Sequence, residues 1–284
     1  MSTATPETFH ILGVPLRAGS FYPGSENDAQ AFRDVQLADR LQAAGCQVVD
    51  EGDLAVPSYL PHHMLPPIRN WPAPRVVWDL VGERIAPLLR PGHVPLLIGC
   101  DCSIVVGTAQ AVSRAAGGDV HVLYLDGDLD DAPPRPDRSV SAAAAAVWLL
   151  THESPFWTGP ALDPSQVTVI GCDSAQATTR AVPVTEIRRL GPTAAARHVL
   201  DGLPSSTSVV LHFDIDVLRH EELPAAYFPH TEGLDVAEVR EVLRTLLADP
   251  RVRVLEVTEY ASLRDGDRRS AGRLTDLLTE TLPR

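Results

Sequence analysis

Residues 122–132, VLYLDGDLDDA, join an apolar run to a cluster of aspartates, and residues 209–218, VVLHFDIDVL, repeat that arrangement. Each apolar run has the length and the β-branched or aromatic content of a buried strand. The acids that follow the first run are Asp126, Asp128 and Asp130, and those of the second stretch are Asp214 and Asp216. Because alternate residues of an extended segment share one face, each set of aspartates is predicted to converge on one point.

Outward from these two stretches, short apolar runs alternate with longer segments of helical periodicity. The predicted strands are residues 10–14, 47–50, 94–98, 121–125, 167–170, 208–213 and 252–257. The predicted helices are residues 27–44, 76–89, 104–114, 142–150, 192–200, 236–247 and 271–282, and residues 57–74 form a predicted Pro-rich loop. Strands separated by helices indicate βαβ units, so we expect an α/β fold, a three-layer α/β/α sandwich with a mainly parallel central sheet. No long linker interrupts the pattern, and residues 1–284 are predicted to form one domain.

The composition narrows the classes of partner. The formal net charge is −13 and the chain has no lysine, which argues against nucleic acid or an anionic membrane as the main partner. Four cysteines are too few for a disulfide scaffold in 284 residues. The start of the chain lacks the features of a signal peptide, and no stretch reaches the roughly 18 apolar residues of a membrane span. We therefore expect a soluble, cytoplasmic protein.

Functional groups of parallel α/β sheets gather at the carboxyl ends of the strands, which is where the two aspartate sets lie. A third predicted strand, in residues 96–103 (LLIGCDCS), ends at Asp101 and Cys102. Five carboxylates in one pocket would repel one another unless a cation or bound protons compensated them. Oxygen-rich sites suit Mn²⁺, Mg²⁺ or Ca²⁺. The alternative is that DGDLDD is a solvated acidic turn and that FDID is a strand followed by a capping acid.

Several motifs, in order and spacing, resemble those of the ureohydrolase superfamily, which comprises arginase, agmatinase and formiminoglutamase. The opening segment, residues 11–33, looks like the first strand, Gly-rich loop and first helix of that family. GCDCS (residues 99–103) occupies the place of a Gly-Gly-Asp-His-Ser motif, DGDLD (126–130) that of Asp-Ala-His-x-Asp, FDID (213–216) that of Phe-Asp-x-Asp, and EGLD (232–235) that of a Gly-Gly-Leu element. Glu256, in LEVTEY, matches the glutamate of a Glu-Val-Asn-Pro element. The resemblance covers nearly the whole chain and implies an arginase-like fold.

The resemblance also implies a reaction, in which a pair of Mn²⁺ ions holds a hydroxide that attacks the guanidinium carbon of a small cationic substrate. The residues that match metal ligands of the family are Asp126, Asp130, Asp214 and Asp216. Glu256 matches the residue that pairs with the guanidinium. Mn²⁺ is the expected metal, as one or two ions, with Fe or Zn as alternatives, and a homo-oligomer (trimer or hexamer) is the expected assembly.

The chain departs from the family at both metal-binding histidines, which are replaced by Cys102 and Asp128. The family's proton-shuttling histidine falls near Ser141 or Ala142, and neither of these can carry a proton near neutral pH. His152, His220 and His230 are the candidate replacements, and His230 is the best placed because it precedes EGLD. An asparagine that reads the α-carboxylate of arginine is not evident in residues 132–145.

Cys102 has three interpretations: a metal ligand, a nucleophile, or an inert buried thiol. Asp128 would complete or perturb the metal shell, and Asp128, Glu256 and His230 are the candidate catalytic residues. The leading hypothesis is a metal-dependent hydrolase that cleaves a C–N bond of a guanidino, hydroxyguanidino or amidine-type compound, in specialised metabolism. The alternatives are a catalytically silent binding or assembly subunit with the same fold, and altered chemistry that uses Cys102 covalently.

Overall fold

The computed structural model describes residues 7–58, 63–157, 159–173 and 178–283. Residues 59–62 of the predicted Pro-rich loop lie outside this part of the chain. Within it, no helix has both the length and the apolar character to cross a bilayer.

Eight parallel strands form one sheet in the described residues, in the order β2-β1-β3-β8-β7-β4-β5-β6. Their bounds are β1 (Thr8–Gly13), β2 (Gln47–Asp53), β3 (His93–Ile98), β4 (Val120–Leu125), β5 (Val167–Ile170), β6 (Arg180–Val182), β7 (Ser208–Asp214) and β8 (Val252–Thr258). The central strands are buried on both faces, as a parallel sheet between two helical layers requires. The predicted α/β/α sandwich is confirmed.

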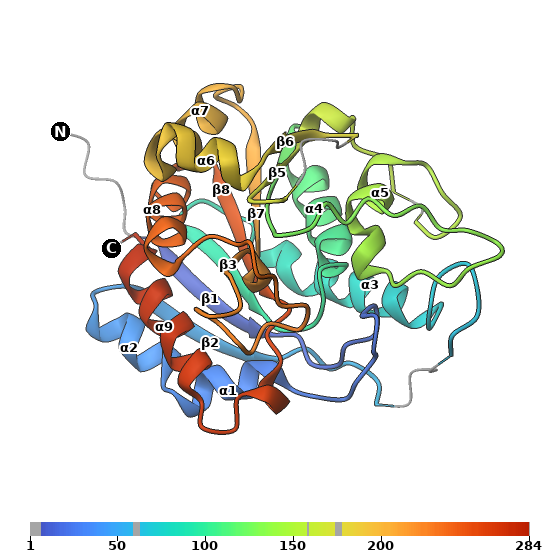
Figure 1. Cartoon of the computed structure of the whole chain (residues 1–284), viewed down its shortest axis with the longest axis horizontal. Helices are drawn as coiled ribbons and strands as arrows, with labels where there is room; N and C mark the ends of the chain where they lie inside the picture. The colour runs from blue at the N-terminus through green and yellow to red at the C-terminus, as the bar shows by residue number, and fades with distance from the viewer. Residues whose placement is uncertain (1–6, 59–62, 158, 174–177, 284) are drawn as a thin grey trace.

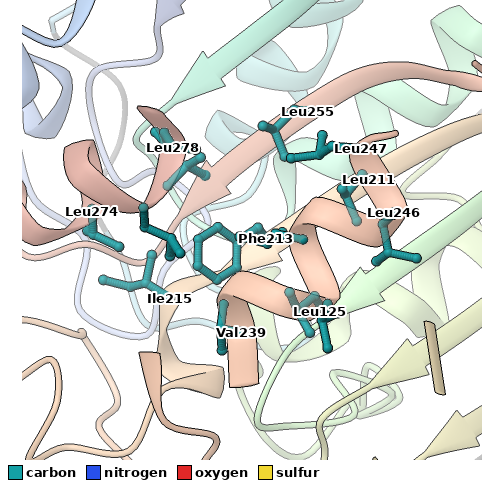
Figure 2. Packing of buried hydrophobic residues seen from close by; sticks show 14 of the residues in the cluster. Leu125, Leu211, Phe213, Ile215, Val239, Leu246, Leu247, Leu255, Leu274 and Leu278 are labelled. Carbon is teal, nitrogen blue, oxygen red and sulfur yellow. The ribbon is translucent and has the colours of Figure 1, made fainter. Parts of the chain in front are cut away.

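Helices cover both faces of the sheet (Figure 1). On one face lie α1 (Asp28–Asp34), α2 (Leu37–Ala43), α6 (Val184–Leu190), α7 (Pro192–Asp201), α8 (Val236–Leu247) and α9 (Arg269–Thr281). On the other lie α3 (Ala73–Ile85), α4 (Ile104–Ala115) and α5 (Ala146–Thr151). Phe213 of β7 packs among leucines of α8 and α9 in the first layer, as Figure 2 shows.

Alternate residues of one strand serve the two layers. In β4, Leu123 and Leu125 belong to the core under α8, while Val122 and Tyr124 belong to the core under α4. Helices α3 and α4 pack closely against each other at Gly107 of α4. A Cβ added there would lie only 2.2 Å from the carbonyl oxygen of Trp78 in α3.

Three local features differ from the sequence-based expectations. The predicted helix over residues 27–44 is two helices, because Gln36 adopts a left-handed backbone (φ 61°) between α1 and α2. β6 and α6 had no counterpart among the predicted elements: β6 is only three residues long, too short for a periodicity to reveal. The predicted helix over residues 142–150 is a 3₁₀ turn (Ala143–Ala145) followed by α5.

Candidate metal centre

The carboxyl ends of β4 and β7 bring the two aspartate sets together. These strands are neighbours in the sheet, with Leu125 paired to Phe213, so Asp126 and Asp214 follow at the same edge. Both side chains are buried. One ligand atom each of Cys102, Asp126, His212 and Asp214 can be chosen so that all lie within 4.8 Å of one another. We call these four residues the first group.

A second group consists of Asp128, Asp216 and His230, whose ligand atoms meet the same 4.8 Å limit. The Nε2 atom of His230 lies 3.4 Å from Asp128 Oδ2 and 3.6 Å from Asp216 Oδ2. That nitrogen is buried and makes no hydrogen bond within the described chain. Asp128 is the exposed member, with 58% of its side chain accessible, so this group lies at the rim.

A cavity of about 150 Å³ connects the groups. Its lining residues are Phe21, Cys102, Asp126, Asp128, Asp130, Ser141, Ala143, Ala144, Asp214, Asp216, Phe228 and Glu259. Asp130 is held by a hydrogen bond of 2.6 Å from the Tyr124 hydroxyl and has a left-handed backbone (φ 46°). Every one of the six residues expected to bind metal therefore lines one cavity.

Burial and mutual repulsion dominate the electrostatics of the cavity. Burial raises the pKa of Asp126 well above its usual range, and Asp214 and Asp216 raise it further. The pKa values of Asp130 and Asp214 are raised in the same way, first by burial and then by neighbouring acids. The raised pKa values favour the protonated carboxyls in the metal-free chain, and a bound cation would compete with those protons. The donor set thus fits a divalent cation: several converging, buried oxygen ligands that lack a buried counter-charge of their own.

His230 does not line the cavity, but it pairs with Asp128 and Asp216, which do. Asp128 and Asp216 raise the pKa of its imidazole to about 10, so it is protonated beside them at neutral pH. His152 stacks on Trp148 instead, with ring centroids 4.8 Å apart, and His220 is exposed. Ser141 lines the cavity, and its Oγ accepts a hydrogen bond from the Ala144 amide. Of the candidate proton carriers, the geometry favours His230.

Cys102 is a neutral thiol in this environment. Its Sγ lies 2.7 Å from Asp214 Oδ2, to which it donates. Burial raises the pKa of the Cys102 thiol well above its usual range, and Asp214 and Glu259 raise it further. A thiolate nucleophile needs a nearby cation or base. These acidic neighbours therefore argue against the covalent hypothesis, while a bound cation would favour the thiolate as a ligand.

Glu256 lies in a different place from the one the resemblance led us to expect. It is completely buried in β8, opposite His212 of β7, whose Nδ1 lies 2.7 Å from Glu256 Oε2. The His212 ring stacks on Tyr124, with centroids 4.2 Å apart. Glu256 thus belongs to a polar layer below the cavity and is not among the residues that line it. This placement corrects the expectation that Glu256 faces the substrate.

Glu259, which the sequence motifs did not single out, lines the cavity instead. It follows the end of β8 with a left-handed backbone (φ 58°), which turns its side chain towards the site. One carboxylate oxygen accepts the Cys102 amide N–H at 3.3 Å, and the other accepts Arg17 Nη1 at 3.0 Å. The available signal was an acid directly after a strand, the same signal that identified Asp126.

Arg17 supplies a buried positive charge behind Glu259. It is 1% exposed, and its Nη2 lies 2.8 Å from Asp28 Oδ2. Its guanidinium also lies over the Tyr227 ring, 4.2 Å from the centroid, and donates to the carbonyl of Tyr260. An arginine with two acidic partners stays charged when buried. The wall of the cavity that carries Glu259 is therefore fixed and charge-compensated.

Comparison with known proteins gives a consistent result. The family model described as the arginase family matches residues 7–282. The arginase of Bacillus subtilis is 23% identical, with 97% of this chain and 98% of that protein covered. Among solved structures, the arginase of Entamoeba histolytica in complex with L-ornithine has a TM-score of 0.85 at 17% identity, covering 97% of this chain and 98% of that one. The proclavaminate amidino hydrolase of Streptomyces clavuligerus has a TM-score of 0.73 at 22% identity, covering 98% of this chain and 91% of that one.

Proposed function

Since this chain belongs to the arginase family, we propose that it is a divalent-metal-dependent hydrolase that cleaves a C–N bond of a guanidino, hydroxyguanidino or amidine-type small molecule in specialised metabolism. The observation that carries the proposal is the convergence of five aspartates in one cavity with raised pKa values for the buried ones. Such a set of acids destabilises a chain that has no cation to bind. A metal ion explains why they lie together.

The first group is the proposed metal site, with Cys102, Asp126 and Asp214 as ligands and Asp130 beside them. Mn²⁺ suits the oxygen-rich part of this set, and the thiol makes Fe²⁺ or Zn²⁺ the alternatives. When bound, a divalent cation would act as a Lewis acid and would lower the pKa of water enough to supply hydroxide near neutral pH. In the second group, His230 Nε2 already pairs with Asp128 and Asp216, at 3.4 and 3.6 Å, so we propose one metal ion per chain.

We assign the other roles in the reaction to side chains that lie in or beside the cavity. Glu259 binds the cationic head of the substrate, and Arg17 keeps the Glu259 carboxylate oriented. Burial raises the pKa of Glu259 to about 8 and Arg17 opposes that rise, so a cationic head group bound beside it would favour the ionised carboxylate. His230 donates the proton that the leaving nitrogen requires, through the Nε2 atom that faces Asp128 and Asp216. Glu256 and His212 support the floor of the site from below.

Metal analysis joined to an activity screen tests the proposal. Chain reconstituted with Mn²⁺, Fe²⁺ or Zn²⁺ is analysed for bound metal and then incubated with guanidino, hydroxyguanidino and amidine compounds, with urea, hydroxyurea and ammonia as readouts. We expect one ion per chain and turnover that the Asp126→Asn variant lacks. A chain that binds no metal and releases no product would support the silent binding subunit instead.

The role of His230 has its own control. In the His230→Gln variant we expect bound metal to stay at one ion per chain while kcat falls about 100-fold or more, the usual effect of losing a general acid. Two ions in the wild-type chain and one in this variant would make His230 a metal ligand.

A further inference from the structure

Two aromatic side chains form the roof of the acidic cavity. Phe21 and Phe228 line it, yet 37% and 38% of their surfaces remain accessible. Their rings meet edge to face, with centroids 5.9 Å apart, and they come from segments about two hundred residues apart in the sequence. Large apolar side chains exposed together at the mouth of a cavity mark a surface that a ligand covers.

This roof is held in position before any ligand binds. The Arg69 guanidinium lies over the Phe21 ring, 4.1 Å from its centroid, and donates to the Phe21 carbonyl. The Tyr227 hydroxyl donates to the Tyr22 carbonyl and so joins the two aromatic segments. A ligand that uses such a roof does not have to order it first.

A second cavity, of about 330 Å³, adjoins the first. Phe21, Ser141 and Ala144 belong to both linings. The other lining residues of this outer cavity are Ala132, Pro133, Arg135, Arg138, Ser139 and Val140. The inner cavity is therefore acidic and the outer one is mostly apolar, and the two meet beneath Phe21.

Among the described residues, the outer cavity has no carboxylate that could pair with an ammonium group; apart from its charged side chains, its polar side-chain groups are the hydroxyls of Ser139 and Ser141. None of the described residues that line it is acidic, and its two charged residues are arginines. Arg135 is engaged with Asp137 through hydrogen bonds of 3.1 and 3.0 Å. The amino group of an amino acid or the second cation of a polyamine would thus meet two arginines and, within the described lining, no carboxylate in this cavity.

We propose that the substrate is a guanidine with a bulky apolar body, an alkyl or aryl guanidine. The cationic head lies among the carboxylates, and the body passes under Phe21 and Phe228 into the outer cavity. The inference rests on the proposed function for the identity of the head group, and on the two cavities for the body.

Calorimetric titration of the Mn²⁺-loaded chain with n-alkylguanidines tests this directly. From propylguanidine to octylguanidine, each added methylene should tighten binding about fourfold until the outer cavity is filled. Arginine and agmatine should bind at least about tenfold more weakly than hexylguanidine. Affinity that does not change with chain length, or arginine binding more tightly than hexylguanidine, would overturn the inference.

Variants separate the roof from the rest of the surface. Phe21→Ala and Phe228→Ala should flatten the chain-length dependence while methylguanidine binding changes little. Tyr22→Ala is the matched control, since Tyr22 is 62% exposed in the same aromatic group but lines neither cavity. An Ala144→Phe variant, which fills the junction, should bind methylguanidine and lose octylguanidine; equal binding of both would also contradict the inference.

The binding measurement tests the apolar substrate class, and the turnover measurement tests the hydrolase proposal, so either can be refuted without the other. Chain-length-dependent binding without urea release would leave the apolar substrate class standing and refute the hydrolase proposal. Urea release from arginine in preference to every alkylguanidine would do the reverse.

Discussion

Replacing Asp126 by asparagine tests whether the converging carboxylates destabilise the metal-free chain. Ligand atoms of Asp126 and Asp214 lie within 4.8 Å of each other, and both residues are buried. Two unit charges at that distance repel by about 3 kcal/mol when the effective dielectric constant is about 20. The variant removes one of them and keeps the shape of the side chain.

Both polar groups of the new asparagine amide can form hydrogen bonds. Its carbonyl oxygen can accept the Asp128 amide N–H, which now donates to Asp126 Oδ1 at 2.6 Å, and its NH₂ can donate to Asp214. We therefore expect the metal-free variant to be more stable than the wild type, by up to about 3 kcal/mol near pH 8. The gain should shrink as the pH is lowered, because burial and neighbouring acids raise the pKa of Asp214 and its protonation relieves the repulsion.

Thermal unfolding after dialysis against a chelator measures the effect. At about 2–4 °C per kcal/mol for a chain of this size, the melting temperature should rise by about 6–12 °C without metal. Added Mn²⁺ should stabilise the wild type and leave the variant unchanged.

Asp265→Asn is the matched control. Asp265 is also buried, but N–H groups of Ala271 and Ser270 and the Tyr260 hydroxyl outweigh the effect of burial and hold the pKa of Asp265 below its usual range. Its loss should destabilise the chain with or without metal. If Asp126→Asn lowers the melting temperature of the metal-free chain as Asp265→Asn does, the electrostatic argument is refuted.

Three further outcomes follow from the same structure. Mn²⁺ affinity should fall as pH is lowered from about 8 to about 6, because the raised pKa values of the first-group aspartates mean that the metal displaces protons; calorimetry in buffers of different ionisation enthalpy counts them. Burial lowers the pKa of His121 to about 4 from 6.5. The neutral imidazole therefore contributes fully to stability above pH 6.5, and the free energy of unfolding should fall by about 3 kcal/mol at most as the pH is lowered to about 4. If a His121→Gln variant shows the same pH dependence in denaturant unfolding, His121 is not the cause. Gly107→Ala should lower the free energy of unfolding by several kcal/mol, as an overpacked core does, because the added Cβ would clash with the Trp78 carbonyl. In Gly272→Ala, in α9, the added Cβ meets no atom within 4 Å, so this variant should gain up to about 1 kcal/mol in the same unfolding assay.

The two aspartate sets could be located from the sequence because their positions depend on local rules. An apolar run of strand length ends where Asp126 and Asp214 begin, and parallel strands place their carboxyl ends together. That β4 and β7 are direct neighbours is a different matter, since β5 and β6 intervene in the sequence. Only the family resemblance indicated that pairing, through the matching order of its motifs.

The residues that sequence analysis missed depend on the strand ends and on distant partners. Glu256 matched a motif, but the alternation of side chains along β8 turns it towards His212, and Glu259, beyond the strand end, reaches the cavity. Arg17 gave no local signal, because its partner Glu259 lies 242 residues away in the sequence. Contacts of that separation follow from the packing of loops at the sheet edge, which periodicity does not describe.

The departures from the family pattern have to be considered together with two cationic side chains from other loops, Arg17 and His230. Replacement of one neutral imidazole by Asp128 adds an acid at the rim of the site, whereas replacement of the other by Cys102 adds a thiol that stays neutral without a cation. Arg17 pairs with Glu259 and Asp28, and His230 pairs with Asp128 and Asp216. Within the described residues no ion pair reaches Asp126, Asp130 or Asp214, so the acids that lack a cation are those around the first group. A silent subunit would gain nothing from those uncompensated acids, which only lower its stability. The same acids become favourable when a divalent ion binds, and this asymmetry is the physical reason to prefer a metal-dependent enzyme.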